Sequence, residues 1–114
     1  MNEFILIFRS EPGTTVLTPE QMKNVSQPWI DWMGSLAAQN KLANIGNRLG
    51  YNAAVLKPND VVINGPYSEI KEIIAGFSVV FAETLEEAIE IAKGCPIFDV
   101  GGSVEVRNVI QMSN

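Results

Sequence analysis

The chain has 114 residues, of which 46% are hydrophobic and 18% charged, and its formal net charge is −5. This length and composition predict one globular domain over residues 1–114 and exclude a disordered chain. Nucleic-acid binding requires clustered Lys and Arg side chains. The eight basic residues are scattered among thirteen acidic ones, so we expect no direct contact with DNA or RNA.

The apolar run Phe4–Phe8 is too short for a membrane span or a signal sequence. The single cysteine, Cys95, cannot form an internal disulfide. We therefore expect a cytoplasmic protein without membrane contact. A mean hydropathy of +0.12 is apolar for a small monomer, which indicates that some apolar surface is buried against a partner.

The first half of the chain predicts a strand and a long helix. Residues 3–9 form a strand that is apolar on both faces. Thr18 and Pro19 are typical of a helix start, with Thr18 as the cap and Pro19 at the first helical position. Pro28 interrupts this helix, and we expect a kink or a break there, with Ser26 capping the second half. The apolar stripe of the helix includes Trp29, Trp32, Met33 and Leu36.

The middle of the chain predicts three further strands. Residues 42–49 favour a short irregular strand. Residues 53–57 and 61–64 flank Pro58-Asn59-Asp60, which is typical of a hairpin turn. Residues 76–83 form a second strongly apolar strand.

The last third predicts a helix and a strand. Thr84 begins a capping box, and the helix after it has an inward stripe of Leu85, Ala88, Ile89 and Ala92. Residues 103–109 alternate cleanly, so that Val104 and Val106 lie on one side and Ser103, Glu105 and Arg107 on the other.

This order of elements predicts an α+β fold, a split β-α-β arrangement with two helices on one face of the sheet. The other face is left bare. Because the first strand is apolar on both faces, we expect a second subunit to stack sheet against sheet on that bare face.

Four segments carry a family resemblance. "NGPYSEIKEIIAGF" (64–77) resembles the Asp-Gly-Pro-Phe signature of the DGPF group within the YCII-related domain proteins. The segments "GNRL" (46–49), "EEAIEIAKGCPI" (86–97) and "GGSVEVRNV" (101–109) resemble further parts of that family in the same order. The resemblance extends from Glu3 to about Ile110.

This resemblance implies a ferredoxin-like fold that forms a homodimer as a dimeric α/β barrel. Many relatives are uncharacterised, some are similar to lyase-like or dehydrochlorinating enzymes, and some accompany extracytoplasmic-function sigma factors. Two departures matter. The signature Asp is Asn64 here, and its Phe is Tyr67. In addition, the chain contains no histidine. The His-Asp pair associated with the wider family is therefore absent, and so is a carboxylate base at position 64.

The signature segment has a structural and a functional interpretation. Asn64-Gly65-Pro66 is typical of a plain turn, and Asn64 could equally line a pocket and offer its amide to a ligand. Glu69 and Lys71 could form a solvated charged patch. Alternatively, Glu69 acts as an acid or base in a cleft with Lys71 beside it. Tyr67 is a packed aromatic residue or a phenolic acid.

Three further charged residues have the same two interpretations. Glu105 and Arg107 point into the bare face, where they either form an ion pair inside the dimer or hold a ligand, with Arg107 gripping a carboxylate. Arg48 is interpreted in the same way. Cys95 follows the end of a helix, which raises the pKa of a thiol, so we expect no nucleophilic role. No residue pattern predicts a metal site or a cofactor.

We expect a protein that binds a small organic ligand near the dimer seam, lined by Arg48, Asn64, Tyr67, Glu69, Lys71, Glu105 and Arg107. Whether it is an enzyme stays open. The second hypothesis is a cofactor-independent lyase or isomerase acting on a small organic acid or aromatic compound, with Glu69 as the base. The third is a protein-interaction module tied to transcriptional regulation.

Overall fold

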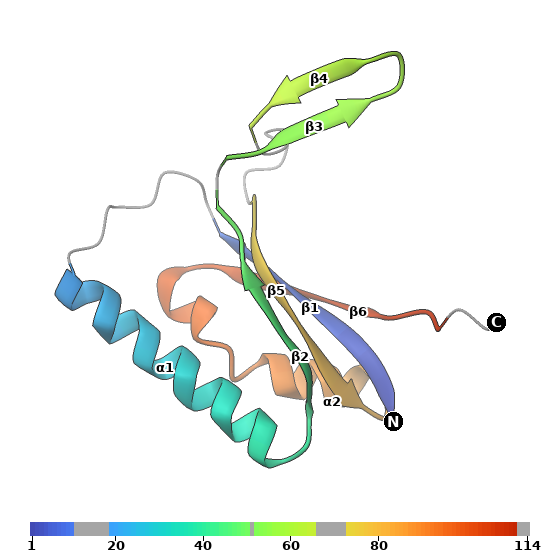
Figure 1. Cartoon of the computed structure of the whole chain (residues 1–114). Helices are drawn as coiled ribbons and strands as arrows, with labels where there is room; N and C mark the ends of the chain where they lie inside the picture. The colour runs from blue at the N-terminus through green and yellow to red at the C-terminus, as the bar shows by residue number, and fades with distance from the viewer. Residues whose placement is uncertain (11–18, 51, 66–72, 112–114) are drawn as a thin grey trace.

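A four-stranded antiparallel sheet and two helices form the body of the protein in a computed structural model (Figure 1), which describes residues 1–10, 19–50, 52–65 and 73–111. The strands are β1 (Asn2–Ser10), β2 (Leu42–Arg48), β5 (Ile73–Ala82) and β6 (Ser103–Asn108), and their order in the sheet is β2-β5-β1-β6. The helices are α1 (Pro19–Ala38) and α2 (Leu85–Ala92). The predicted α+β fold is confirmed.

The sheet has one face against the helices and one face without them. Phe4, Leu6 and Phe8 of β1 are buried in the core together with residues of α1 and α2. The side chains that alternate with them face the other way and are half-buried. We call this second face the open face, because among the described residues no element covers it. Its residues are Glu3, Ile5, Ile7 and Arg9 of β1, Phe77, Val79 and Phe81 of β5, and Ser103, Glu105 and Arg107 of β6.

Helix α1 runs without interruption through Pro28. The predicted break is wrong, because Ser26 lies within the helix and does not start a second one. A proline inside a helix costs about 3 kcal/mol, and the aromatic packing of the residues that follow it contributes to offsetting this cost. The ring centroids of Phe8 and Trp29 lie 5.0 Å apart, those of Trp29 and Trp32 lie 5.8 Å apart, and both contacts are edge-to-face. The proposed Thr18 cap lies outside the described residues.

Helix α2 begins with the predicted capping box. The Thr84 hydroxyl accepts a hydrogen bond from the backbone N–H of Glu87 at 3.2 Å, and the Glu87 carboxylate accepts one from the backbone N–H of Glu83 at 3.3 Å. The predicted inward stripe is partly wrong. Ala88, Ile91 and Ala92 are buried, whereas Leu85 and Ile89 are exposed. Both sets fit a helical period, so the pattern alone did not fix which one faces the sheet.

Strand β2 is irregular, as predicted, and it lies at an edge of the sheet. Its pairing with β5 shifts register twice, between Leu42 and Asn44 and between Asn44 and Asn47. Gly46 lies in the second bulge with φ +72°, and its backbone N–H donates to the side-chain oxygen of Asn44 at 2.8 Å. A Cβ atom at position 46 would meet the carbonyl oxygen of Phe77 at 1.7 Å. Only glycine fits this bulge.

The predicted hairpin forms a separate two-stranded sheet of β3 (Ala54–Lys57) and β4 (Val61–Asn64). Asn59 and Asp60 take left-handed φ values of 68° and 62° in its turn, which suits these residue types. The hairpin extends beyond the end of the four-stranded sheet, on the side away from α1 (Figure 1).

A short 3₁₀ helix, η1 (Pro96–Val100), precedes β6 and was not predicted. In β6 the predicted alternation is confirmed, because Val104 and Val106 pack against the core. The chain measures 47 × 42 × 20 Å, and 20 Å is the thickness of one sheet and one layer of helices. Among the described residues, no helix is long and apolar enough to cross a membrane.

Candidate functional site

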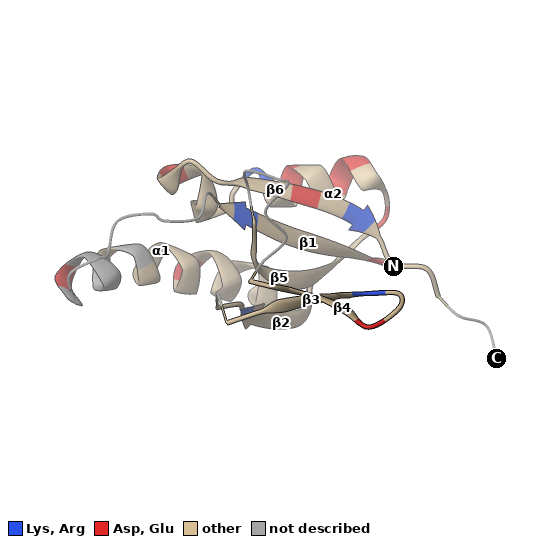
Figure 2. Cartoon of the chain, turned by 90° about the horizontal axis from the view of Figure 1, so that it is seen from above, with Lys and Arg blue, Asp and Glu red and all other residues tan. Residues whose placement is uncertain are grey.

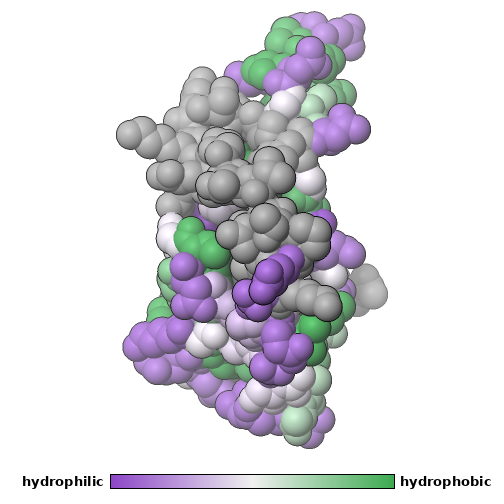
Figure 3. All heavy atoms as spheres, turned by 90° about the vertical axis from the view of Figure 1, so that its left-hand side faces the viewer, coloured by the Kyte–Doolittle hydropathy of each residue, from purple (hydrophilic) through white to green (hydrophobic). Residues whose placement is uncertain are grey.

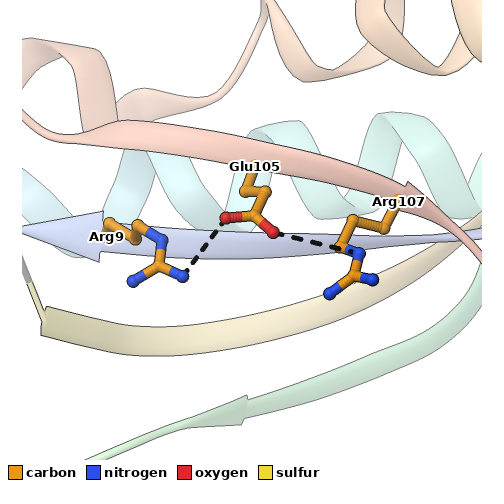
Figure 4. A network of polar contacts seen from close by, with 3 residues as sticks. All are labelled: Arg9, Glu105 and Arg107. Carbon is orange, nitrogen blue, oxygen red and sulfur yellow. Dashed lines mark hydrogen bonds and ion pairs between the residues drawn. The ribbon is translucent and has the colours of Figure 1, made fainter. Parts of the chain in front are cut away.

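Three charged side chains meet on the open face (Figure 4). The Nη2 atom of Arg9 donates to the Oε1 atom of Glu105 at 3.2 Å, and the Nε atom of Arg107 lies 4.0 Å from the Oε2 atom of Glu105. The side chain of Arg9 is 20% exposed, that of Glu105 41% and that of Arg107 69%. The group thus has one carboxylate for two guanidinium groups, and the guanidinium of Arg107 is the more accessible to a ligand. We call it the charged triad.

Strand register places the triad beside an apolar surface. Glu105 lies opposite Ile7, and Ile7 lies opposite Phe77. Arg107 lies opposite Ile5, and Ile5 lies opposite Val79. Residues directly opposite each other in antiparallel strands have their side chains on the same face. Arg107 and Glu105 therefore border an apolar patch contributed by β1 and β5.

Sequence reasoning missed Arg9. Its position carries the signal, because Ile5, Ile7 and Arg9 alternate with the buried Phe4, Leu6 and Phe8 and so share the open face. Its partner Glu105 lies 96 positions further along the chain, and only the pairing of β1 with β6 brings the two together.

Arg48 does not join the charged triad. It lies at the end of β2 opposite Gly76, which lies opposite Phe8. Phe8 belongs to the core on the helix-covered side. The register therefore places Arg48 at the margin of that side, where it is exposed.

Asn64 lies on the hairpin and not on the four-stranded sheet. It is the last residue of β4 and pairs with Ala54. The following residue, Gly65, has φ +87°, and its N–H donates to the carbonyl of Ala53 at 2.6 Å. The turn interpretation of Asn64-Gly65 is supported by this geometry. Tyr67, Glu69 and Lys71 lie outside the described residues.

Glu86, Glu87 and Glu90 lie on α2, whereas β1 and β6 carry basic residues together with Glu105 (Figure 2). Among the described residues, no group of His, Cys, Asp or Glu side chains has the geometry of a metal site. Cys95 is buried, and burial raises the pKa of its thiol to about 11.

A hollow of about 330 Å³ lies between the start of β1 and the end of β6. It is lined by Met1, Asn2, Glu3, Phe4, Asn108, Val109 and Gln111. Of the predicted site residues that the structure describes, none lines it. In the described part of a single chain, the charged triad and its apolar patch thus form an open surface and not an enclosed cavity.

The comparisons with known proteins agree with the family named from the sequence segments. No curated protein matches the chain. The sequence profile of the YCII-related domain matches residues 3–113, which is nearly the whole length. The chain belongs to the YCII-related domain family.

Proposed function

We propose that the protein is a homodimer of the DGPF type that stacks its two open faces as a dimeric α/β barrel and binds a small organic anion at the seam. The observation that carries this proposal is the position of the charged triad, with its surplus guanidinium group, at the border of an uncovered apolar patch.

The exposed area of the chain supports dimerisation. A folded monomer of 12.5 kDa is expected to expose about 6,200 Å². This chain exposes 8226 Å², an excess of about 2,000 Å² over that expectation. An obligate dimer buries roughly 1,000–2,500 Å² on each subunit. The excess is therefore of the size that a stable second copy would remove from water.

Stacking would also change the environment of the charged triad. In water, an exposed ion pair contributes about 0–1 kcal/mol to stability. Between two sheets about 10 Å apart, the same charges lose water, and an unbalanced guanidinium group then has to find an anion. A ligand carboxylate can supply that charge in a bidentate contact with Arg107. The neighbouring Ile5, Ile7, Phe77 and Val79 favour an apolar or aromatic body for the same ligand.

The test uses light scattering for the oligomeric state and calorimetry with a panel of aromatic monocarboxylates and their uncharged amides. We expect a dimer at micromolar concentration that binds at least one acid and not its amide. The Arg107→Gln variant should bind at least tenfold more weakly, since a charge-assisted hydrogen bond contributes about 1.5–3 kcal/mol. Lys93→Gln, which removes a positive charge from α2, is the matched control and should bind within twofold of the wild type.

Two results would contradict the proposal. A monomer at micromolar concentration would remove the seam. If a variant of Arg48 lost binding and Arg107→Gln kept it, the ligand site would lie on the other side of the sheet and not on the open face.

A further inference from the structure

The β3–β4 hairpin has an uncovered apolar face. Leu56 and Val62 lie opposite each other in this hairpin and are 77% and 56% exposed. Ala54 and Asn64 form the next pair on the same face. Val55 and Ile63, on the other face, are half-buried. Green, apolar atoms reach the surface of the hairpin at the top of Figure 3.

An isolated two-stranded hairpin is at best marginally stable in water. Strands β3 and β4 pair only with each other, and among the described elements nothing covers the face with Leu56 and Val62. A surface of this kind needs a partner to stay ordered and soluble.

We infer that the hairpin is an arm that crosses the seam and packs the Leu56–Val62 face on the second copy, where it closes one end of the ligand site. This inference rests on the proposed dimer and adds to it a part of the pocket that only the partner supplies. Asn64, at the base of the same face, then lies at the pocket edge, in agreement with the functional interpretation of that residue.

The position of the hairpin indicates a second copy as the occupant. The hairpin connects the end of β2 to the start of β5, which is the end of the sheet that holds Arg9. From there it extends beyond the sheet and away from α1 (Figure 1), and so away from the helix-covered side. A four-residue strand spans about 13 Å, whereas stacked sheets lie about 10 Å apart. The arm is therefore long enough to reach a subunit stacked on the open face, and a two-fold axis gives the same contact twice.

The experiment compares two neighbouring valines on opposite faces of the arm. Val62→Lys changes the face that we assign to the interface, and Val61→Lys changes the face that carries Lys57. We expect Val62→Lys to raise the dimer dissociation constant at least tenfold in sedimentation equilibrium, and Val61→Lys to change it less than threefold. Circular dichroism and the unfolding temperature show whether each variant is folded.

A second measurement detects the contact between the two copies directly. The Leu56→Cys substitution in a Cys95→Ala chain provides the thiol for a spin label, and this labelled chain is mixed with a second copy that carries ¹³C-labelled isoleucine methyl groups and no spin label. We expect the spin label to broaden the Ile5 or Ile7 methyl signals of the ¹³C-labelled copy, because these residues lie on the open face. Such broadening would support the packing of the hairpin on the second copy.

The outcomes separate this inference from the proposed function. In one outcome, the wild-type protein is dimeric and binds the acid, while the spin label causes no broadening and Val62→Lys has no effect. That result would overturn the role of the hairpin as an arm and leave the proposed function intact. If the Leu56–Val62 face contacts a different protein instead, the spin label again causes no broadening and Val62→Lys leaves dimerisation unchanged, which also overturns the inference. A monomeric wild type would remove the proposed function itself.

Discussion

Cys95 shows how burial decides the chemistry of a single residue. Its side chain is 3% exposed. Burial is the main cause of its raised pKa, the backbone N–H of Ile97 lowers the value, and the charge of Asp99 raises it. The sequence predicted a raised pKa from the position after a helix. The direction agrees, but the dominant cause is burial, and that depends on the packing of η1 with α1, β1 and β6, which no local pattern shows.

A thiol with a pKa of about 11 makes stability depend on pH. The unfolded thiol ionises near pH 9 and the folded one near pH 11, so the thiol stabilises the folded state fully below pH 9 and loses this contribution as the pH rises to 11. We expect the free energy of unfolding to fall by about 2–3 kcal/mol over this interval. Urea unfolding of the wild type and of Cys95→Ala at several pH values measures the difference. Parallel pH curves for the two proteins would contradict the prediction.

The charged triad could be predicted only in part from the sequence. Alternation along residues 103–109 predicted that Glu105 and Arg107 share one face, and the structure bears this out. Alternation says nothing of which strand lies alongside. Arg9 pairs with Glu105 because β6 lies next to β1. Arg48 lies apart because it is opposite Gly76 at the end of β2, on the side of the sheet that Phe8 faces.

At the scale of elements, most strands and both helices followed from apolar period and capping residues. The errors occurred where two patterns were equally good or where packing overrode a local preference. In α2, two sets of apolar residues fit the helical period, and only contact with the sheet selects one. In α1, the edge-to-face contacts among Phe8, Trp29 and Trp32 hold the helix through Pro28.

The second bulge of β2 gives a prediction at this scale. Gly46→Ala introduces a Cβ atom 1.7 Å from the Phe77 carbonyl oxygen at a positive φ, so the strand has to move. We expect a loss of about 3 kcal/mol or more in the free energy of unfolding. Gly34→Ala is the matched control, because a Cβ atom there meets nothing within 4 Å. In the helix it should stabilise the protein by up to about 1 kcal/mol. Chemical unfolding measures both, and equal effects of the two variants would contradict the role of the bulge.

At the scale of the whole molecule, the flat shape is the feature that links fold and function. The radius of gyration is 15.7 Å, against about 13 Å for a globular chain of this length. The placement of both helices on one face and the first strand, apolar on both faces, predicted an apolar bare face, and the hairpin itself was also predicted. Its direction was not, because the direction of a projecting hairpin depends on the sheet end to which it is joined.

The proposed dimer makes unfolding depend on protein concentration. Association stabilises the folded state by mass action, so the unfolding temperature should rise with concentration by several degrees between 1 and 100 μM. Differential scanning calorimetry or circular dichroism measures the shift. The Val62→Lys variant should unfold at a lower temperature than Val61→Lys at the same concentration. An unfolding temperature that stays constant over this range would contradict an obligate dimer.

The two bulges of β2 also have a consequence for how assembly ends. An edge strand with regular pairing presents free N–H and C=O groups that can recruit another chain edge to edge, and such pairing has no natural limit. The register shifts at Asn44 and Asn47 interrupt that row of groups along β2. Growth along this edge of the sheet is thereby disfavoured. In the proposed dimer, association takes place through the open face and ends at two copies.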